Sequence, residues 1–313
     1  MSLKDVFRST SQLEWELARK EPFSHFYNTV SPSELKILQE TLYSAFSDFN
    51  TFCLENNIEY AIVAGTLIGA VRHGGFIPWD DDIDIILPRA DYEKIALILE
   101  KSSFKDKYEI VFPETDHDIS LCAKFVIKGT SLFDIWGNNY SKEDRIYIDL
   151  LPIDAVPNNK YLAKFIGKSV DLLSMSYASL RCWRKYCEHL YVMAKYSNTL
   201  KYNLMFRKLI SLPALMMGRV GTIKLIHKLL KLAPINKNSK ATVALGVKRY
   251  FGEIINYSDF FPSKDIQFED LMVKAPANAH NYLSNRYGDY MKVPDKSEQQ
   301  ERLVRLKGNW NEK

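Results

Sequence analysis

The sequence predicts an α+β fold, in which a mixed β-sheet core is flanked by helices and carries a basic helical insertion. Three observations predict it: an amphipathic helix before residue 57, strand-like apolar segments between residues 60 and 151, and a helical pattern from about 160 to 240. Strands followed by a run of helices are typical of α+β chains, or of α/β chains with a helical second lobe. The 313 residues, 46% apolar and 26% charged, fit one large or two small globular domains and exclude disordered and collagen-like chains.

The first predicted element is a helix that begins after Ser31. Ser31-Pro32-Ser33-Glu34 combines a capping box with proline at the first helical position. Apolar residues then recur every three or four positions from Leu35 to Phe52, and the helix should end near Asn56-Asn57. A central strand is expected over Tyr60–Ala64, apolar on both faces and ended by Gly65.

The later elements follow from alternation and from turn residues. We expect a strand over Asp82–Leu87, a helix over Asp91–Glu100, a hairpin formed by 121–127 and 131–136, and a strand from Ile146 that ends at Pro152. The character changes at Pro157-Asn158-Asn159, after which helices broken by prolines are expected. The predicted divisions are a core over 1–158, a basic helical insertion over 159–245 and a C-terminal segment over 246–313 that completes the catalytic domain.

The segment that carries chemistry is GTLIGAVRHGGFIPWDDDIDI, residues 65–85. Gly65-Thr66 ends a strand and leads into a helix start, where backbone N–H groups bind phosphate. Arg72 and His73 supply cationic or hydrogen-bonding groups between this turn and a run of acids. The acids are Asp80, Asp81, Asp82 and Asp84.

The acids predict a metal site. Asp82 and Asp84 are two residues apart, so in a strand they would share one face. Carboxylates this close repel unless they are protonated or bridged by a cation, and Mg²⁺ or Mn²⁺ is the natural bridge. Asp149, an acid inside an apolar strand, should complete the group because burying it alone would be costly. Asp154 is expected at a turn or cap.

This pattern resembles the LicD family of phosphocholine transferases, relatives of the fukutin-type transferases in the nucleotidyltransferase superfamily. The resemblance rests on residues 65–84, on Ile148-Asp149-x-x-Pro152-x-Asp154, and on Tyr282-Leu283-x-x-x-Tyr287-Gly288-Asp289-Tyr290-Met291. It covers about residues 35–155 and 250–295. Two departures are Leu150-Leu151 where the family usually has Ile-Phe, and Gly74 where Lys or Gln is frequent.

The resemblance implies a nucleotidyltransferase-like mixed sheet and a CDP-activated donor such as CDP-choline. It implies transfer of a phospho-alcohol, most often phosphocholine, to a cell-surface glycan or its lipid-linked precursor, with release of CMP. The family's metal-binding acids fall on Asp82, Asp84 and Asp149, and its Gly-Ser position falls on Gly65-Thr66. Asp149 would complete the metal site or take the acceptor's proton.

Further residues are assigned to the donor. Arg72, His73 and Lys124 would neutralise the diphosphate, although a lysine on a hairpin is as readily a surface residue. Trp79 would stack on the base or cage a quaternary ammonium, or else pack in the core beside Phe76. Asp80 and Asp81 are candidates for the donor pocket, and Tyr287-Gly288 fits either a wall of the site or a glycine-capped helix end.

Two other functions fit parts of the pattern. A nucleotidyltransferase would add NMP from an NTP to a small molecule, a protein or RNA, releasing pyrophosphate rather than CMP. A non-catalytic glycan-binding protein would have no need of paired acids. A nucleic-acid binder is not expected, because the chain lacks a groove-reading motif.

The charge is unevenly distributed. Residues 189–252 contain twelve Lys and Arg and no acid, which leaves 30 basic against 38 acidic residues elsewhere, although the net charge is only +4. Lys224, Lys228 and Lys231 recur at helical spacing beside the apolar stripe Ile223, Ile226 and Leu230. A basic amphipathic helix fits an anionic membrane surface, or else a helical lobe with solvated lysines. Without a signal peptide, an apolar stretch of 18 residues or a CxxC motif, we expect a cytoplasmic protein with reduced thiols and peripheral contact at the inner membrane face.

Overall fold

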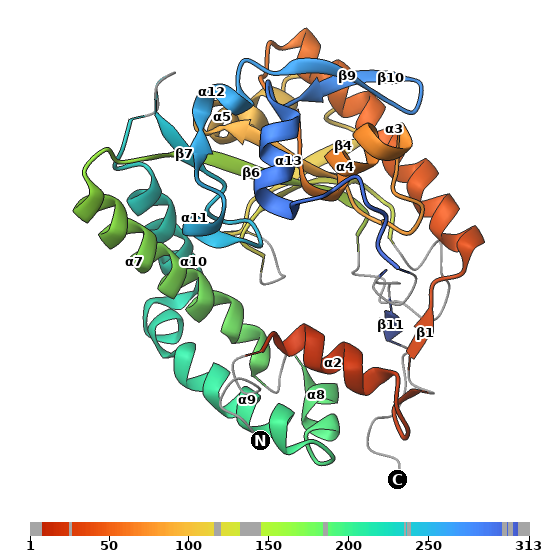
Figure 1. Cartoon of the computed structure of the whole chain (residues 1–313), viewed down its shortest axis with the longest axis vertical. Helices are drawn as coiled ribbons and strands as arrows, with labels where there is room; N and C mark the ends of the chain where they lie inside the picture. The colour runs from red at the N-terminus through yellow and green to blue at the C-terminus, as the bar shows by residue number, and fades with distance from the viewer. Residues whose placement is uncertain are drawn as a thin grey trace.

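The structure is a computed structural model that describes residues 8–24, 27–115, 120–131, 145–183, 187–234, 236, 239–295, 299 and 303–305. It contains a curled mixed sheet with flanking helices, so the predicted fold class is confirmed. In Figure 1 the sheet and its covering helices occupy the upper part of the view, and a group of helices lies across from them.

The main sheet has the order β2-β3-β6-β5-β4, with β7 and β8 added beside β6. Its strands are β2 (Ala61–Ile62), β3 (Asp84–Pro88), β4 (Tyr108–Val111), β5 (Ala123–Ile127), β6 (Tyr147–Val156), β7 (Lys240–Thr242) and β8 (Ile255–Asn256). Among the described strands of this sheet, only β3 and β6 are paired in parallel; the other pairs are antiparallel. The parallel pair therefore stands at the centre, where the predicted acids lie.

The sheet is covered by helices from both ends of the sequence. These are α3 (Pro32–Glu55), α4 (Ala64–His73), α5 (Arg89–Leu99), α12 (Tyr257–Phe260) and α13 (Ala279–Tyr287), with the hairpin β9 (Lys264–Phe268) and β10 (Leu271–Ala275). The capping box predicted at Ser31 is present and starts α3. Phe49 of α3 is fully buried, with its ring 5.4 Å from that of Tyr60 and 5.2 Å from that of Phe125. Such edge-to-face pairs tie α3 to the sheet.

The remaining helices form a second group, here called the helical lobe. It comprises α7 (Lys160–Ser179), the 3-10 turn η3 (Leu180–Cys182), α8 (Glu188–Met193), α9 (Asn198–Ile210) and α10 (Leu212–Leu230). The N-terminal helix α2 (Thr10–Ala18) packs on α8 and α9 through a small apolar cluster of its own. The short helix α11 (Arg249–Gly252) packs against α7, and β1 (Tyr27–Thr29) pairs with β11 (Leu303–Arg305).

Several predicted boundaries differ from the structure. The strand expected over 60–64 is shorter, because Ala64 already begins α4. The strand expected from Asp82 begins at Asp84. The strand expected to end at Pro152 continues to Val156, and β4 was not predicted. Of the expected hairpin, 132–136 lie outside the described residues.

The strand tolerates Pro152 because of where its missing N–H would point. Asp149 N–H donates to the oxygen of Ile83, the residue just before β3, so by alternation the backbone N–H and C=O groups of the even-numbered residues of β6 point to the other side. On that side, β5 pairs only as far as Leu150, and β7 begins pairing at Asp154. Proline therefore occupies the one gap where no ladder bond is lost.

The apolar stripe expected to face a membrane lies instead in the core. Ile223, Ile226 and Leu230 are 1% exposed or less and pack against α7, because α10 uses that face to hold the lobe together. In the described part of the chain, no single helix is long and apolar enough to span a membrane. Helices α9 and α10, which are bent by 60° relative to each other, reach that length and hydropathy as a pair.

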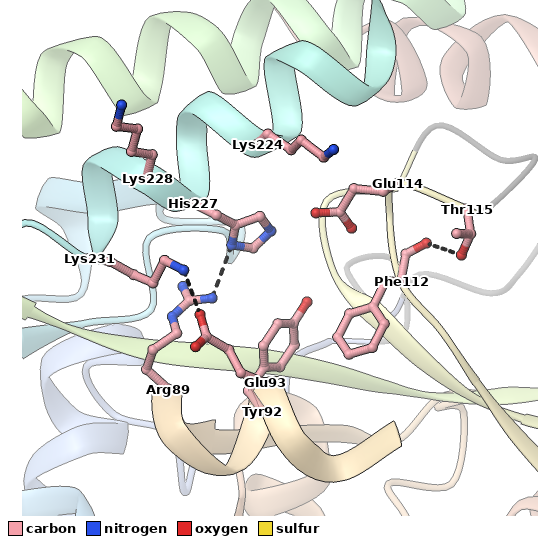
Figure 2. A pocket seen from close by; sticks show the side chains of 10 residues that line it. All are labelled: Arg89, Tyr92, Glu93, Phe112, Glu114, Thr115, Lys224, His227, Lys228 and Lys231. Carbon is pink, nitrogen blue, oxygen red and sulfur yellow. Dashed lines mark hydrogen bonds and ion pairs between the residues drawn. The ribbon is translucent and has the colours of Figure 1, made fainter. Parts of the chain in front are cut away.

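Charged side chains join α5 to α10 (Figure 2). Asp154, expected at a turn or cap, lies in β6 and accepts two hydrogen bonds from Arg89, at 2.7 and 2.5 Å. The Arg89 guanidinium also lies 2.9 Å from His227 Nδ1, and Lys231 pairs with Glu93 at 3.0 Å. A cavity of about 560 Å³ is bordered by Arg89, Glu93, His227 and Lys231, and also by Tyr92, Phe112, Glu114, Thr115, Lys224 and Lys228.

The first prediction concerns His227 and stability. Burial, and then the charges of Arg89 and Lys231, lower its pKa from 6.5 to about 3. Between those values the unfolded chain binds a proton that the folded chain does not. The stability from neutral His227 is therefore present above pH 6.5 and lost as pH falls toward 3. We expect His227→Gln, which keeps a neutral acceptor for Arg89, to flatten the fall of unfolding free energy between pH 6.5 and 4.

Urea unfolding of both proteins at several pH values measures this slope. The acids Glu93 and Glu114 face the same cavity and are present in both proteins, so the comparison isolates the histidine. Equal slopes for the wild type and the variant would contradict the prediction.

Candidate active site

The parallel pairing of β3 and β6 brings two predicted acids together. Asp84 is directly in register with Asp149, and Asp149 is in register with Lys124 on β5. Residues in register share one face of a sheet, so two carboxylates and one ammonium group line the same face of three neighbouring strands. Ile83, Ile85 and Leu87 are fully buried, as expected.

The other acids lie in the loop that enters β3. Carboxylate oxygens of Asp80, Asp81 and Asp82 all lie within 4.8 Å of one another, and the side chains of Asp80 and Asp82 are hydrogen-bonded. Asp82 precedes the strand, so it does not share a strand face with Asp84 in the way predicted. The charge of Asp82 still contributes to raising the pKa of Asp84, and the charge of Asp149 contributes to raising the pKa of Asp82.

Burial, and then the proximity of these acids to one another, raises their pKa values. Burial and then the charge of Asp82 raise the pKa of Asp80 to about 7, and burial and then the charge of Asp149 raise the pKa of Asp82 to about 6. Burial, followed by the charges of Asp82 and Asp149, raises the pKa of Asp84 well above its usual range. The Asp82 side chain is exposed to solvent, although protein atoms surround it. Asp82 therefore lies in a recess that opens to solvent. An all-carboxylate donor set fits a hard divalent cation such as Mg²⁺ or Mn²⁺.

Two contacts hold the acidic loop in place. The Gln39 side-chain amide of α3 donates to Asp80 O at 2.8 Å and to Ile77 O at 3.3 Å. Gly65 provides space, since a Cβ there would lie 2.4 Å from a carboxylate oxygen of Asp80. The chain turns from β2 into α4 with Ala64 in the left-handed region, at φ 50°, a conformation costly for a residue with a Cβ.

Thr66, which was predicted to contact phosphate, makes a hydrogen bond with the backbone at the start of β3. Its side chain is buried, and its hydroxyl accepts the backbone N–H of Asp84 at 2.9 Å. Asp84 is the first residue of β3, so this bond fixes the start of the strand and with it the carboxylate.

The remaining predicted donor residues lie at the end of α4 and in the loop that follows. Arg72 donates to the backbone oxygens of Tyr290 and Lys292, at 2.8 and 3.2 Å, and its Nε–H donates to His73 at 3.0 Å. Its guanidinium is thus engaged with the C-terminal segment. Trp79 is half-buried against the main core and its ring lies 6.2 Å from that of His73.

Lys124 is buried rather than a surface lysine. It is 4% exposed, and its ammonium group lies 4.3 Å from the centre of the Tyr147 ring. Beside it, the Cys122 thiol donates to Asp149 Oδ1 at 3.0 Å. The sequence offered no signal for this thiol, because a single cysteine has no diagnostic spacing.

The C-terminal helix α13 adds groups that the sequence did not single out. Arg286 forms an ion pair with the buried Glu253, and its charge acts to lower the pKa of Asp84. The charge of Asp84 in turn raises the pKa of Tyr287, after burial as the larger cause. The helix ends at Tyr287 with Gly288 at φ 69°, so the interpretation of this motif as a glycine-capped helix end is confirmed.

The chain is similar in sequence to known proteins. Residues 57–172 match the family model described as LicD/FKTN/FKRP, nucleotidyltransferase domain. The chain is 26% identical over 261 residues to the lipopolysaccharide cholinephosphotransferase LicD of Haemophilus influenzae, covering 80% of this chain and 89% of that protein. Uncharacterized proteins of Rickettsia prowazekii and Rickettsia typhi are 31% and 34% identical, over 38% and 37% of this chain and 41% and 39% of their own lengths.

The second prediction tests the role of Thr66. Thr66→Val keeps the shape of the side chain but leaves the buried N–H of Asp84 without its acceptor, which should cost about 1–3 kcal/mol of unfolding free energy. Thr66→Ser restores an acceptor and is expected to regain most of this loss. Denaturant unfolding of the three proteins measures both effects, and equal stability of the valine and serine variants would refute this role.

Proposed function

Residues 57–172 are a LicD-family domain, and from that premise we propose that the chain transfers phosphocholine from a CDP-activated donor to a hydroxyl of a cell-surface glycan. The observation that carries the proposal is the register of Asp84 with Asp149 beside the acidic loop. The named Haemophilus relative, which acts on lipopolysaccharide, supports the choice of choline phosphate and of a glycan acceptor.

The acids are proposed to hold one or two divalent cations on the donor diphosphate. Asp82, Asp84 and Asp149 are the proposed ligands, with Asp80 and Asp81 within reach of the same group. A bound Mg²⁺ or Mn²⁺ would supply charge neutralisation for the diphosphate and for the charge that develops during transfer. The raised pKa values of Asp80 and Asp82 support this, since neighbouring carboxylates that resist ionisation together are relieved by a cation.

Residues of the chain itself accept the proton, bind phosphate and position the acids during the proposed transfer. The acceptor hydroxyl oxygen attacks the choline-bearing phosphorus, the bond from that phosphorus to the bridging oxygen breaks, and CMP leaves with the electron pair. Asp149 accepts the hydroxyl proton. Lys124, buried beside Asp149 in the strand register, binds a phosphate oxygen. Thr66, Gln39 and Gly65 hold the acids in position.

The third prediction concerns the paired acids. Asp84→Asn and Asp149→Asn each keep the size of the side chain and remove its charge. We expect the rate of CMP release from CDP-choline to fall by about 10²–10⁴-fold, with weaker Mn²⁺ binding in Asp84→Asn.

The matched control is Asp106→Asn, an exposed acid outside the site, which should retain both. Near-normal CMP release in either active-site variant would refute the assignment. Pyrophosphate release from an NTP, with no CMP from CDP-choline, would favour the alternative nucleotidyltransferase activity.

We also propose that the chain works on a lipid-linked acceptor while resting on the anionic inner face of the membrane. The corner between α9 and α10 supports this surface, because it carries exposed apolar side chains in a stretch without acids. Met216 is 87% exposed and Leu209 is 67% exposed. Met205, Leu212, Leu215, Met217 and Val220 are also exposed.

The charge of this corner matches an anionic lipid surface. Lys201, Lys208 and Arg219 lie in the same stretch, and each Lys or Arg near such a surface contributes about 1 kcal/mol. Exposed apolar residues with flanking cations are the composition of interfacial segments. These features support the corner as the proposed contact surface, rather than the stripe of α10 that the core buries.

The fourth prediction tests the corner by vesicle flotation. The wild type should float with vesicles containing anionic lipid, less with neutral ones, and should be released by high salt. Leu209→Asp with Met216→Asp should weaken binding at least about tenfold. Leu97→Asp, an equally exposed position on α5, is the control. Salt-independent binding, or retention by the double variant, would contradict the proposal.

A further inference from the structure

A large cavity joins the candidate active site to the helical lobe. Its volume is about 910 Å³, within the range of small-molecule binding sites. Asp149 and Lys124 line it from β6 and β5, while Arg181, Arg207 and Arg249 line it from η3, α9 and α11. In Figure 1, α9 and α2 lie across from the sheet, so segments far apart in the sequence enclose one space.

The three arginines converge from separate segments without an equal number of acids. The lining includes two carboxylates, Glu14 and Asp149. Glu14 accepts from Tyr27 at 3.1 Å and lies 3.0 Å from His189 Nε2. Asp149 accepts from Cys122 and belongs to the acidic group of the site. The lobe side of the cavity is therefore rich in cations, and that property favours an anionic ligand.

Arg207 and Arg249 are close enough for the charge of one to act on the other. Burial lowers the pKa of Arg207, and the charge of Arg249 lowers it further, against an opposite effect of Cys182. Arg207 Nη2 donates to Arg8 O at 3.1 Å, while its buried Nε–H has no hydrogen-bond partner among the described residues. Arg249 occupies the left-handed region at φ 59°, a conformation kept by non-glycine residues mainly where the surroundings require it.

We propose that this cavity binds a phosphate group of a substrate, held by Arg181, Arg207 and Arg249 opposite the reacting end at Asp149 and Lys124. Guanidinium groups suit this role because their planar donors match phosphate oxygens in pairs. This inference rests on the proposed function, and it assigns to the lobe and α11 a part of the site that lies outside the recognised motifs. The phosphate belongs either to the cytidine nucleotide or to a phosphorylated glycan acceptor.

The test uses Arg181→Gln with Arg249→Gln in the full chain. Both side chains are exposed, so the fold should tolerate the change, and an unchanged melting temperature checks this. The matched control is Lys224→Gln with Lys228→Gln, which removes the same charge from the same acid-free run but borders the other cavity. Binding is measured by calorimetry with CMP and with inorganic phosphate, and KM is measured for a phosphorylated glycan acceptor.

We expect the arginine variant to bind CMP about tenfold or more weakly, with a smaller salt dependence, and the lysine control to match the wild type. Unchanged CMP binding with at least a tenfold higher KM for the acceptor assigns the phosphate to the acceptor. Wild-type values in both arms overturn the inference, as does an equal loss in the lysine control.

The result separates this inference from the proposed function. If wild-type chain binds CMP through these arginines but does not release CMP from CDP-choline, the cavity stands and the transferase proposal fails. If transfer occurs and the arginine variant keeps the wild-type CMP binding and acceptor KM, the transferase proposal stands and the cavity inference fails. Arg181→Lys with Arg249→Lys, which keeps the charge, should recover only part of the affinity if paired hydrogen bonds are used.

Discussion

The parallel pairing of β3 with β6 is the constraint on which the rest of the site depends. It sets Asp84 beside Asp149, and the loop that enters β3 adds three more carboxylates. Like charges at this spacing oppose folding unless they are protonated, paired or bridged. The fold therefore has to hold these groups together against their own repulsion, and much of the surrounding structure contributes to doing so.

The supporting contacts come from segments far apart in the chain. Thr66 fixes the first amide of β3, Gln39 fixes the loop, and Arg286 brings a positive charge from α13. Arg286 is itself paired with the buried Glu253, so the cation reaching the acids is held rigidly. Helices α3, α4 and α13 thus act on one site although some 200 residues separate the first from the last. This explains why the recognisable motifs are spread over both ends of the sequence.

Sequence patterns were informative where the physics is local. The capping box at Ser31, the apolar period of α3 and the apolar residues of β3 each depend on neighbouring residues, and each element was found. The boundaries at Ala64 and Pro152 were missed because they depend on a strained turn and on a gap between partner strands. Cys122, Arg286 and the cavity arginines were missed for the same reason, since only tertiary packing brings them to Asp149 or Asp84. The buried state of Lys124 likewise follows from pairing rather than from local pattern.

The net charge of +4 does not show that different parts of the acid-free run, residues 189–252, face different surroundings. Its apolar stripe at Ile223 and Ile226 is core, its corner at Leu209 and Met216 is exposed, and Arg207 with Arg249 faces the cavity. One stretch of chain therefore serves packing, an outer surface and the inner wall of the site. An acid within this stretch would weaken the binding of an anionic partner at the outer surface or at the inner wall, because both lie beside basic groups that favour such partners. The two proposals, membrane contact at the corner and phosphate binding in the cavity, would therefore share one requirement, which is the absence of Asp and Glu over these 64 residues.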